Sequence, residues 1–194
     1  EAKYKLGLFD NPYKYCDPKR PARDIFTREH RDAARRIAAE SFVLLKNEPF
    51  EGQGKKSSRP VLPLEKQGTV AVIGPLGNTR SNMPGTWSVA ARLDDYPSLY
   101  EGLKEMTAGR VNITYAKGSN LIGDVAYEER ATLFGRSLSR DNRTDKELLD
   151  EALKVASGAD VIVAALGESS EMSGESSSRT DLDIPDVQRT LLEA

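Results

Sequence analysis

The sequence has very few of the side chains that build disulfides and metal clusters. Among its 194 residues, Cys16 is the single cysteine and His30 the single histidine. One cysteine cannot form a disulfide within the chain or a cysteine-ligated metal cluster. One histidine excludes a multi-histidine metal site, and a Ser-His-Asp triad would need His30 as its base. We therefore expect neither a metal nor another cofactor.

The sequence also lacks a strong charge of one sign and a long apolar run. It has 28 Lys and Arg against 30 Asp and Glu, with a net charge of −2. It contains no basic stripe that would favour nucleic acid, and its one dense basic run, residues 55–59, lies in a Gly- and Ser-rich stretch typical of a solvated loop. No apolar run is long enough to span a bilayer. We expect no nucleic-acid or membrane partner.

The two ends of the sequence have the features of a segment cut from a longer protein. Residues 1–7 resemble the end of a helix closed by Gly7, and they do not form a signal peptide. The last residues fall inside a helical pattern without a C-terminal cap. Prolines in residues 8–26 favour an extended linker. We predict two parts, residues 1–26 and 27–194. The low cysteine content fits a bacterial protein in either the periplasm or the cytoplasm, so the compartment stays open.

Hydrophobic periodicity predicts an α/β fold with a mostly parallel sheet. Strands are expected at 69–75, 111–118 and 160–166, and helices after Thr27 as N-cap, at 99–106, at 145–159 and from Pro185 onward. The continuous apolar run 160–166 predicts a strand buried on both faces. The short apolar run 43–48 is compatible with a further strand, and residues 49–60 are expected to form a loop.

Two polar loops follow predicted strands at the edge where α/β sheets usually bind ligands. The first, GPLGNTRSNMPGTWS, begins at Gly74 and lacks the third glycine of a dinucleotide fingerprint. Pro75 also removes a backbone donor that a phosphate would need, so nucleotide binding is disfavoured. Trp87 in this loop could stack on a sugar ring, but packing on the core edge is the commoner role.

The second loop, GESSEMSGESSSRTD at 167–181, holds the candidate acid–base residues. It carries Glu168, Glu171 and Glu175, two of them directly after a glycine. A general acid needs a carboxyl group that reaches the leaving-group oxygen and has a suitably raised pKa. On composition alone, a solvated loop charge is the better explanation for any one of these glutamates.

A series of motifs along the chain resembles one enzyme family. SFVLLKNE, LPL, VAVIGP, GTWS, EGL, GADVIVAALGE and SGESSSRTDLDIPDVQ occur in this order. Together they resemble the second domain of glycoside hydrolase family 3, the β-glucosidase family. EAKYKLGLFDNPY resembles the end of that family's first domain, a (β/α)8 barrel, and the start of the linker out of it. The resemblance implies a three-layer α/β sandwich that is incomplete in this chain, with the barrel missing.

The resemblance also implies a divided catalytic apparatus. In this family an aspartate nucleophile lies in the barrel, and a loop of the second domain delivers a glutamate acid/base. Matching the second loop to the family pattern assigns this role to Glu175, with Glu168 as runner-up and Glu171 third. Arg179 and Asp181 are interpreted as a structural pair that shapes the loop, with a direct sugar contact by either residue as the less favoured alternative. The histidine acid/base of some members belongs to a barrel loop, so His30 is expected to be a surface or interface residue.

The implied function is that of a retaining, exo-acting β-glucosidase that removes terminal β-linked glucose from oligosaccharides or glycosides. The chain would supply the acid/base and the missing barrel the nucleophile, so we expect the isolated chain to be inactive. Unburied sheet edges would favour its self-association. No residue of the chain is assigned to sugar binding. The alternative is a stand-alone α/β module that binds a small ligand or a protein without catalysis.

Overall fold

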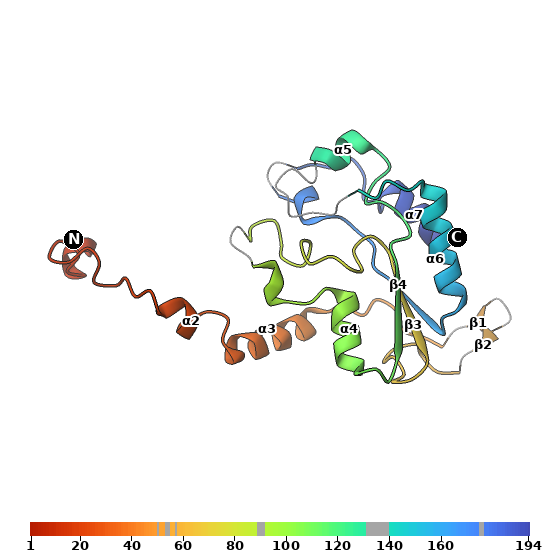
Figure 1. Cartoon of the computed structure of the whole chain (residues 1–194), viewed down its shortest axis with the longest axis horizontal. Coiled ribbons are helices and arrows are strands. Elements are labelled where there is room, and N and C mark those ends of the chain that lie inside the picture. Colours follow the sequence, from red (N-terminus) through yellow and green to blue (C-terminus); the bar gives the residue numbers. More distant parts are fainter. Residues whose placement is uncertain (50, 53–54, 57, 89–91, 131–139, 175–176) are drawn as a thin grey trace. The chain divides into compact units, whose positions relative to one another are not determined.

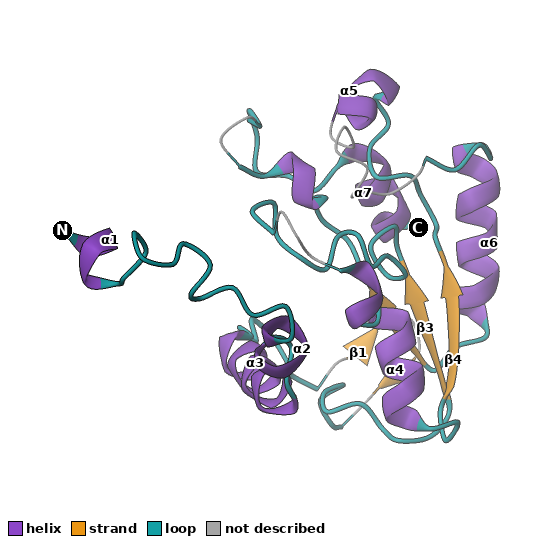
Figure 2. Ribbon diagram, turned by 60° about the vertical axis from the view of Figure 1, so that its left-hand side comes forward, coloured by secondary structure: helices purple, strands orange, loops and turns teal. Residues whose placement is uncertain are grey.

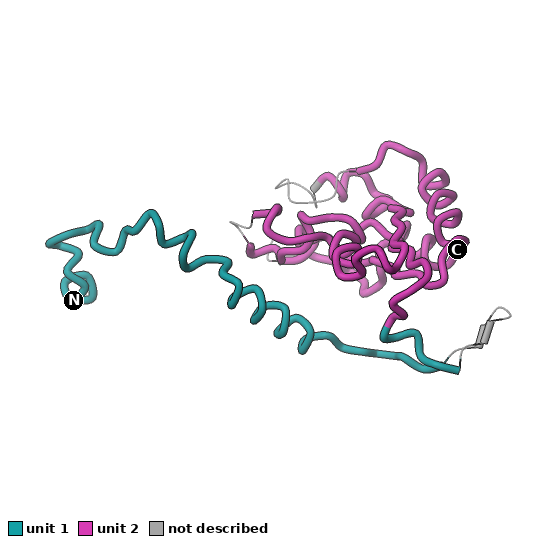
Figure 3. The backbone as a smooth tube through the Cα atoms, turned by 60° about the horizontal axis from the view of Figure 1, so that its bottom comes forward, with its two compact units in different colours: residues 1–63 teal, residues 64–194 magenta. Residues whose placement is uncertain are grey.

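The computed structural model describes residues 1–49, 51–52, 55–56, 58–88, 92–130, 140–174 and 177–194. These residues form two compact units, Glu1–Pro63 and Leu64–Ala194, which are coloured separately in Figure 3. The boundary between the units lies later in the chain than the predicted domain boundary after residue 26. The predicted boundary after residue 26 concerns the domains of a longer protein, so it stays a prediction.

The described residues of unit 1 form three helices and a short hairpin. The helices are α1 (Ala2–Lys5), α2 (Arg20–Asp24) and α3 (Arg28–Ser41), and the antiparallel hairpin pairs β1 (Glu51–Gly52) with β2 (Lys55–Lys56). The predicted N-cap of α3 is confirmed, because the side chain of Thr27 accepts a hydrogen bond from the backbone N–H of His30 at 3.2 Å. His30 itself is exposed, as expected for a surface histidine.

Two predictions for unit 1 need correction. Residues 43–48 do not form a strand, and Leu45 is 91% exposed. An apolar run becomes a strand only when another strand pairs with it, and none of the described residues does so here. The predicted loop at 49–60 contains the β1–β2 hairpin instead of lacking regular structure throughout.

Unit 2 is built on a three-stranded parallel sheet (Figure 1). Its strands are β3 (Thr69–Ile73), β4 (Asn112–Ala116) and β5 (Val161–Ala164), in the order β4-β3-β5. All three strands were predicted. In the register of the sheet, Val70 lies beside Ile113 on one side and Val161 on the other. The carboxyl ends of β3 and β5 are therefore adjacent.

Helices cover both faces of this sheet, which confirms the α/β sandwich. On one face, Val70, Val72 and Ile113 form a buried cluster against Tyr100 and Leu103 of α4 (Leu99–Thr107). On the other face, a second buried cluster packs against α6 (Asp145–Ser157) and α7 (Asp186–Glu193); it contains Ala71, Ile73, Ala116 and Ala152, with Leu191 beside it. Figure 2 shows α4 and α6 on opposite sides of the sheet.

Strand β5 differs from its prediction in burial. It was expected to be buried on both faces, but exposure alternates along it and Ile162 is 52% exposed. The physical reason is its position, since β5 pairs with β3 alone among the described strands and is an edge of the sheet. Val161 and Val163 pack against the α4-side cluster, whereas Ile162 lies on the opposite face.

The remaining short elements lie in the connections: the 3-10 turns η1 (Leu93–Asp95) and η2 (Ser170–Met172), and helix α5 (Val125–Arg130). The described part of the chain has no helix with the length and apolar character needed to cross a membrane.

Candidate functional site

The candidate site lies where the loops after β3 and β5 meet. The first loop is residues 74–88 and the second loop is residues 167–181. The backbones approach closely at their start, where the N–H of Leu76 donates to the carbonyl of Ala165 at 3.2 Å. Gly74 has φ +127°, and a Cβ atom there would lie 2.3 Å from the Ala165 oxygen. The close contact with the Ala165 backbone therefore requires a glycine at position 74. This contact accounts for the glycine of the Gly-Pro turn, so nucleotide binding is not needed to explain it.

Side chains of the first loop hold the backbone of the second. The Asn82 side-chain oxygen accepts from the N–H of Ser170 at 2.9 Å. The Thr86 hydroxyl donates to the carbonyl of Ser173 at 2.9 Å and also contacts that of Ser170. Gly174, with φ +115°, follows directly, and a Cβ atom there would lie 3.0 Å from the Thr86 methyl group. The residue before Glu175 is therefore packed against the first loop.

An arginine within the second loop binds residues near both of its ends. Arg179 donates to Glu168 at 2.8 Å, to Asp181 at 2.7 Å and to the carbonyl of Asp183 at 2.7 Å. The hydrogen bond from Arg179 lowers the pKa of Asp181, and the same bond raises the pKa of Arg179. The predicted pair Arg179–Asp181 is present, and Glu168 belongs to the same cluster.

A buried amide supports the same region from helix α7. Gln188 is 0% exposed, and its side chain hydrogen-bonds both the N–H and the carbonyl of Gly167, at 2.8 and 2.9 Å. It also donates to the carbonyl of Leu121 at 2.6 Å. Reasoning from the sequence missed Gln188. The available signal was a polar residue at the helical spacing of Ile184 and Leu191, on the apolar side of a predicted helix.

The three candidate glutamates have different surroundings. Glu168 is an ion-pair partner of Arg179. Glu171 lies in η2 and forms no ion pair with any residue that the structure describes, while its carbonyl accepts from the Ser177 hydroxyl at 2.7 Å. Glu175, the residue assigned as acid/base, lies outside the described residues. Its role, and that of its two alternatives, stays a prediction.

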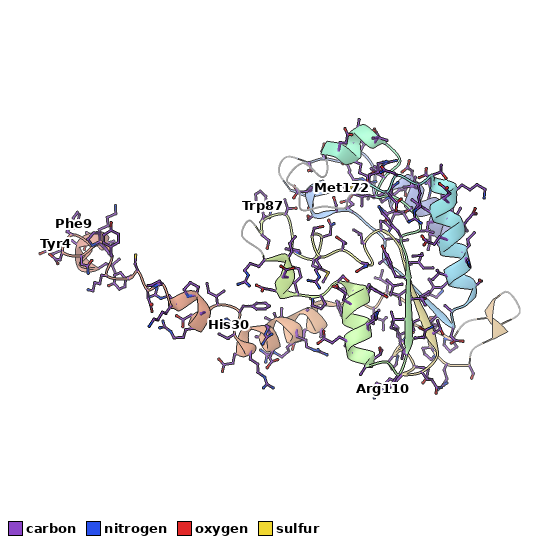
Figure 4. The ribbon with its side chains drawn as sticks, viewed as in Figure 1. Tyr4, Phe9, His30, Trp87, Arg110 and Met172 are labelled. Atoms are coloured by element: carbon purple, nitrogen blue, oxygen red, sulfur yellow. The ribbon has the colours of Figure 1, made fainter. Side chains whose placement is uncertain are left out.

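Trp87 is more exposed than a residue of the core. It is 67% exposed, and one of its ring carbons would lie 3.8 Å from a Cβ atom at Gly174. Figure 4 shows Trp87 and Met172 at the opposite end of unit 2 from Arg110, which precedes β4. Trp87 thus does not pack into the core of the described residues, and both interpretations, a packing residue and a stacking surface beside the second loop, stay predictions.

Comparison with known proteins decides the family. A profile of the Glycosyl hydrolase family 3 C-terminal domain matches residues 42–194. The chain belongs to glycosyl hydrolase family 3. The resemblance inferred from the motifs is thus confirmed.

Several relatives in family 3 are similar along nearly the whole chain. The chain is 37% identical over 195 residues to the "Periplasmic beta-glucosidase" of Salmonella typhimurium, covering 99% of this chain and 24% of the relative. It is 36% identical over 167 residues to the "Thermostable beta-glucosidase B" of Acetivibrio thermocellus, covering 85% of this chain and 18% of the relative. The chain therefore spans at most about a quarter of the length of these relatives.

Solved structures of β-glucosidases share the fold. A Listeria innocua β-glucosidase in complex with isofagomine matches with a TM-score of 0.68 and 29% identity, over 97% of this chain and 22% of that structure. A β-glucosidase of Erythrobacter marinus matches with a TM-score of 0.66 and 30% identity, over 99% of this chain and 25% of that structure. The three-layer arrangement of unit 2 is thus an arrangement of this family.

Proposed function

We propose that the chain is part of a longer retaining, exo-acting β-glucosidase that hydrolyses terminal β-linked glucose from oligosaccharides or glycosides. Membership of family 3 and the β-glucosidase relatives support the reaction class. The observation that carries the proposal is the second loop. This carboxylate-rich segment is anchored to the first loop at the carboxyl ends of β3 and β5, the edge at which α/β sheets bind ligands.

Glu175 is the proposed acid/base of this enzyme. Glu168 is less suited because its carboxylate is already bound by Arg179. Glu171 is less suited because it lies in η2, whose backbone is hydrogen-bonded to the first loop and to Ser177. Glu175 follows Gly174, and a glycine at that place allows the backbone to approach a ligand. Gly174 itself lies beside the Thr86 methyl group of the first loop.

The proposed reaction has two steps that use the same carboxyl group. In the first, Glu175 protonates the glycosidic oxygen while an aspartate of the barrel attacks the anomeric carbon and displaces the leaving group. In the second, the Glu175 carboxylate takes a proton from water, which attacks the glycosyl-enzyme and frees glucose and the aspartate. The two carboxyl groups of a retaining enzyme lie about 5 Å apart, one on each side of the bond.

The barrel domain is thus the required partner of this chain. The nucleophile and most of the glucose contacts belong to the barrel in the proposed enzyme. We infer that the chain alone does not hydrolyse glucosides. The proposal involves no metal or organic cofactor, and it fits either the periplasm or the cytoplasm of a bacterium.

The test compares Glu175→Gln and Glu168→Gln in the longer enzyme, with p-nitrophenyl β-glucoside as substrate. Glutamine keeps the shape of glutamate and removes the transferable proton. We expect kcat to fall about 100-fold or more for Glu175→Gln, the typical range of general acid–base catalysis. Added azide should restore much of this rate, because azide attacks the glycosyl-enzyme without needing a general base.

Glu168→Gln is the matched control, since it is an equal change in the same loop. Collapse of Glu168→Gln alone would move the acid/base to Glu168. Unchanged rates in both variants would contradict an acid/base in this loop and would favour the alternative of a binding module.

A further inference from the structure

Gln188 is a fully buried polar side chain that joins α7 to the start of the second loop. Both of its amide hydrogens and its oxygen are used, in the three hydrogen bonds to Gly167 and Leu121. Burying an amide is unfavourable unless its hydrogen bonds are made, and here they are made to backbone groups alone. An apolar residue at this point of α7 would fill the space without fixing the position of either backbone.

The paired bonds to Gly167 fix the point where the chain leaves β5. The N–H and the carbonyl of one residue both bind the same side chain, as they would bind a neighbouring strand. Gly167 has φ +138°, a conformation that L side chains rarely adopt. Since a glycine restrains its own dihedral angles very little, the Gln188 amide supplies the restraint that sets the direction of the second loop.

Gln188 also joins the two ends of that loop. The second loop begins at Gly167 and leads into α7 through Pro185, whose carbonyl accepts from the backbone N–H of Gln188 at 3.0 Å. The third bond, to Leu121, adds the chain that follows β4. The side chain of Leu121 is itself fully buried against Met172 of η2 in the second loop. One amide therefore connects both ends of the loop to a third backbone segment.

We propose that Gln188 is a positioning residue for the acid/base: it closes the base of the second loop and so fixes where that loop presents its glutamate. This inference rests on the proposed function. Gln188 is too buried to touch substrate and acts through Gly167. Displacement of a catalytic group by about 1 Å can cost on the order of 100-fold in rate, so a loss of this restraint should be visible in the proton-transfer step.

The experiment uses Gln188→Met in the longer enzyme, with Leu191→Ala as the matched control on the same helix. Methionine keeps the length of glutamine and removes all three hydrogen bonds. Leu191 packs against Gly118 and the α6 side of the sheet, so its truncation loosens α7 without breaking the bonds to Gly167. The rates compared are kcat/KM for 2,4-dinitrophenyl β-glucoside, a good leaving group, and for phenyl β-glucoside, which needs protonation.

We expect Gln188→Met to lower kcat/KM for the phenyl substrate at least about tenfold more than for the dinitrophenyl substrate, a part of the 100-fold or more that general acid catalysis contributes. Leu191→Ala should lower both values by the same factor, because loss of folded enzyme does not depend on the leaving group. Equal losses for both substrates in Gln188→Met would overturn the proposal.

Two further variants, Gln188→Asn and Glu175→Gln, distinguish failure of the Gln188 inference from failure of the proposed function. Gln188→Asn keeps the amide but is one methylene shorter, and it should show the same dependence on the leaving group with a smaller factor. If both Gln188 variants lose the fold while Leu191→Ala retains it, Gln188 is a residue of global stability and the proposal is overturned.

The Glu175→Gln variant tests the proposed function itself. If Glu175→Gln lacks the leaving-group dependence, the proposed function fails. If Glu175→Gln shows the dependence and Gln188→Met does not, the Gln188 inference fails alone.

Discussion

At the scale of single residues, the site depends on glycines at positions where a Cβ atom would not fit. Gly74 is the clearest, because its φ is +127° and the carbonyl of Ala165 takes up the space of a side chain. The contact couples β3 to the start of the second loop through the backbone. Gly85 also lies in the first loop, but a Cβ atom there would have open space around it. The structure therefore requires a glycine at position 74 and does not require one at position 85.

We predict that Gly74→Ala lowers the free energy of unfolding by about 2 kcal/mol or more, from strain at positive φ with a clash against backbone added. Gly85→Ala should change it by less than about 0.5 kcal/mol, because its new methyl group meets no atom. Urea unfolding of both variants, followed by circular dichroism, measures the difference. Equal stabilities would mean that the backbones of β3 and β5 do not approach this closely.

Arg179 shows which part of the site a local pattern can reveal. Its partner Asp181 is two residues away, and this pair was predicted from the sequence. The contacts of Asn82 and Thr86 with Ser170 and of Gln188 with Gly167 join residues far apart in the chain, so no local pattern could predict them. The position of the loop was predictable and its anchors were not.

At the scale of elements, periodicity predicted the strands and the long helices nearly to their ends. The helix expected at 99–106 is α4, which ends at Thr107, and the one expected at 145–159 is α6, which ends at Ser157. Pairing was not predictable in this way. Residues 43–48 have the composition of a strand but no partner, and Ile162 is exposed because β5 lies at the sheet edge. Both corrections depend on which strands pair with each other, and the composition of a segment does not specify its pairing partners.

Helix α4 starts at a capping box that is also tied to the first loop. Ser98 accepts from the N–H of Glu101 at 3.2 Å, and Glu101 accepts from the N–H of Ser98 at 2.8 Å. Arg80 of the first loop binds the same carboxylate through two hydrogen bonds of 2.9 Å. The hydrogen bond from Arg80, and after it that from the Ser98 backbone, lower the pKa of Glu101 to about 2.

This pKa predicts an acid-sensitive helix start. A carboxyl group with a lowered pKa in the folded state stabilises the fold at pH values above its ordinary pKa of 4.5, and the contribution is lost as the pH falls towards about 2. In the unchanged protein, the protection of α4 amides from hydrogen exchange should therefore decrease between pH 6 and pH 3, after correction for intrinsic rates. Glu101→Gln should be less protected at pH 6 and should show little of this decrease.

Helix α6 is the internal control for this experiment. It begins with a separate capping box, Thr144 with Glu147, which does not involve Arg80. Its protection should be the same in the Glu101→Gln variant and in the unchanged protein. A parallel loss in α6 would mean that the variant loosens the whole unit, and the explanation by Glu101 would be rejected.

At the scale of the whole molecule, the described sheet of unit 2 has two edge strands, β4 and β5, and an apolar surface adjoins β5. Among the described strands, β5 pairs on one side alone, so its other side leaves backbone N–H and carbonyl groups free to pair. An apolar groove adjoins it between α6 and α7; its lining includes Leu153, Ile162, Leu166 and Leu192. In the proposed longer enzyme this surface would need to be covered, and in the isolated chain a second copy is available to cover it.

We therefore predict that the isolated 194-residue chain self-associates and that Ile162→Lys weakens this association. Ile162 lies on the exposed face of the edge strand, and a lysine there adds charge to a surface that association would bury. Sedimentation velocity over a range of protein concentrations measures the change. Val43→Lys is the matched control, because Val43 is 79% exposed in unit 1 and belongs neither to the strand nor to the groove. A monomeric unchanged chain, or equal weakening by both substitutions, would show that the β5 edge does not drive association.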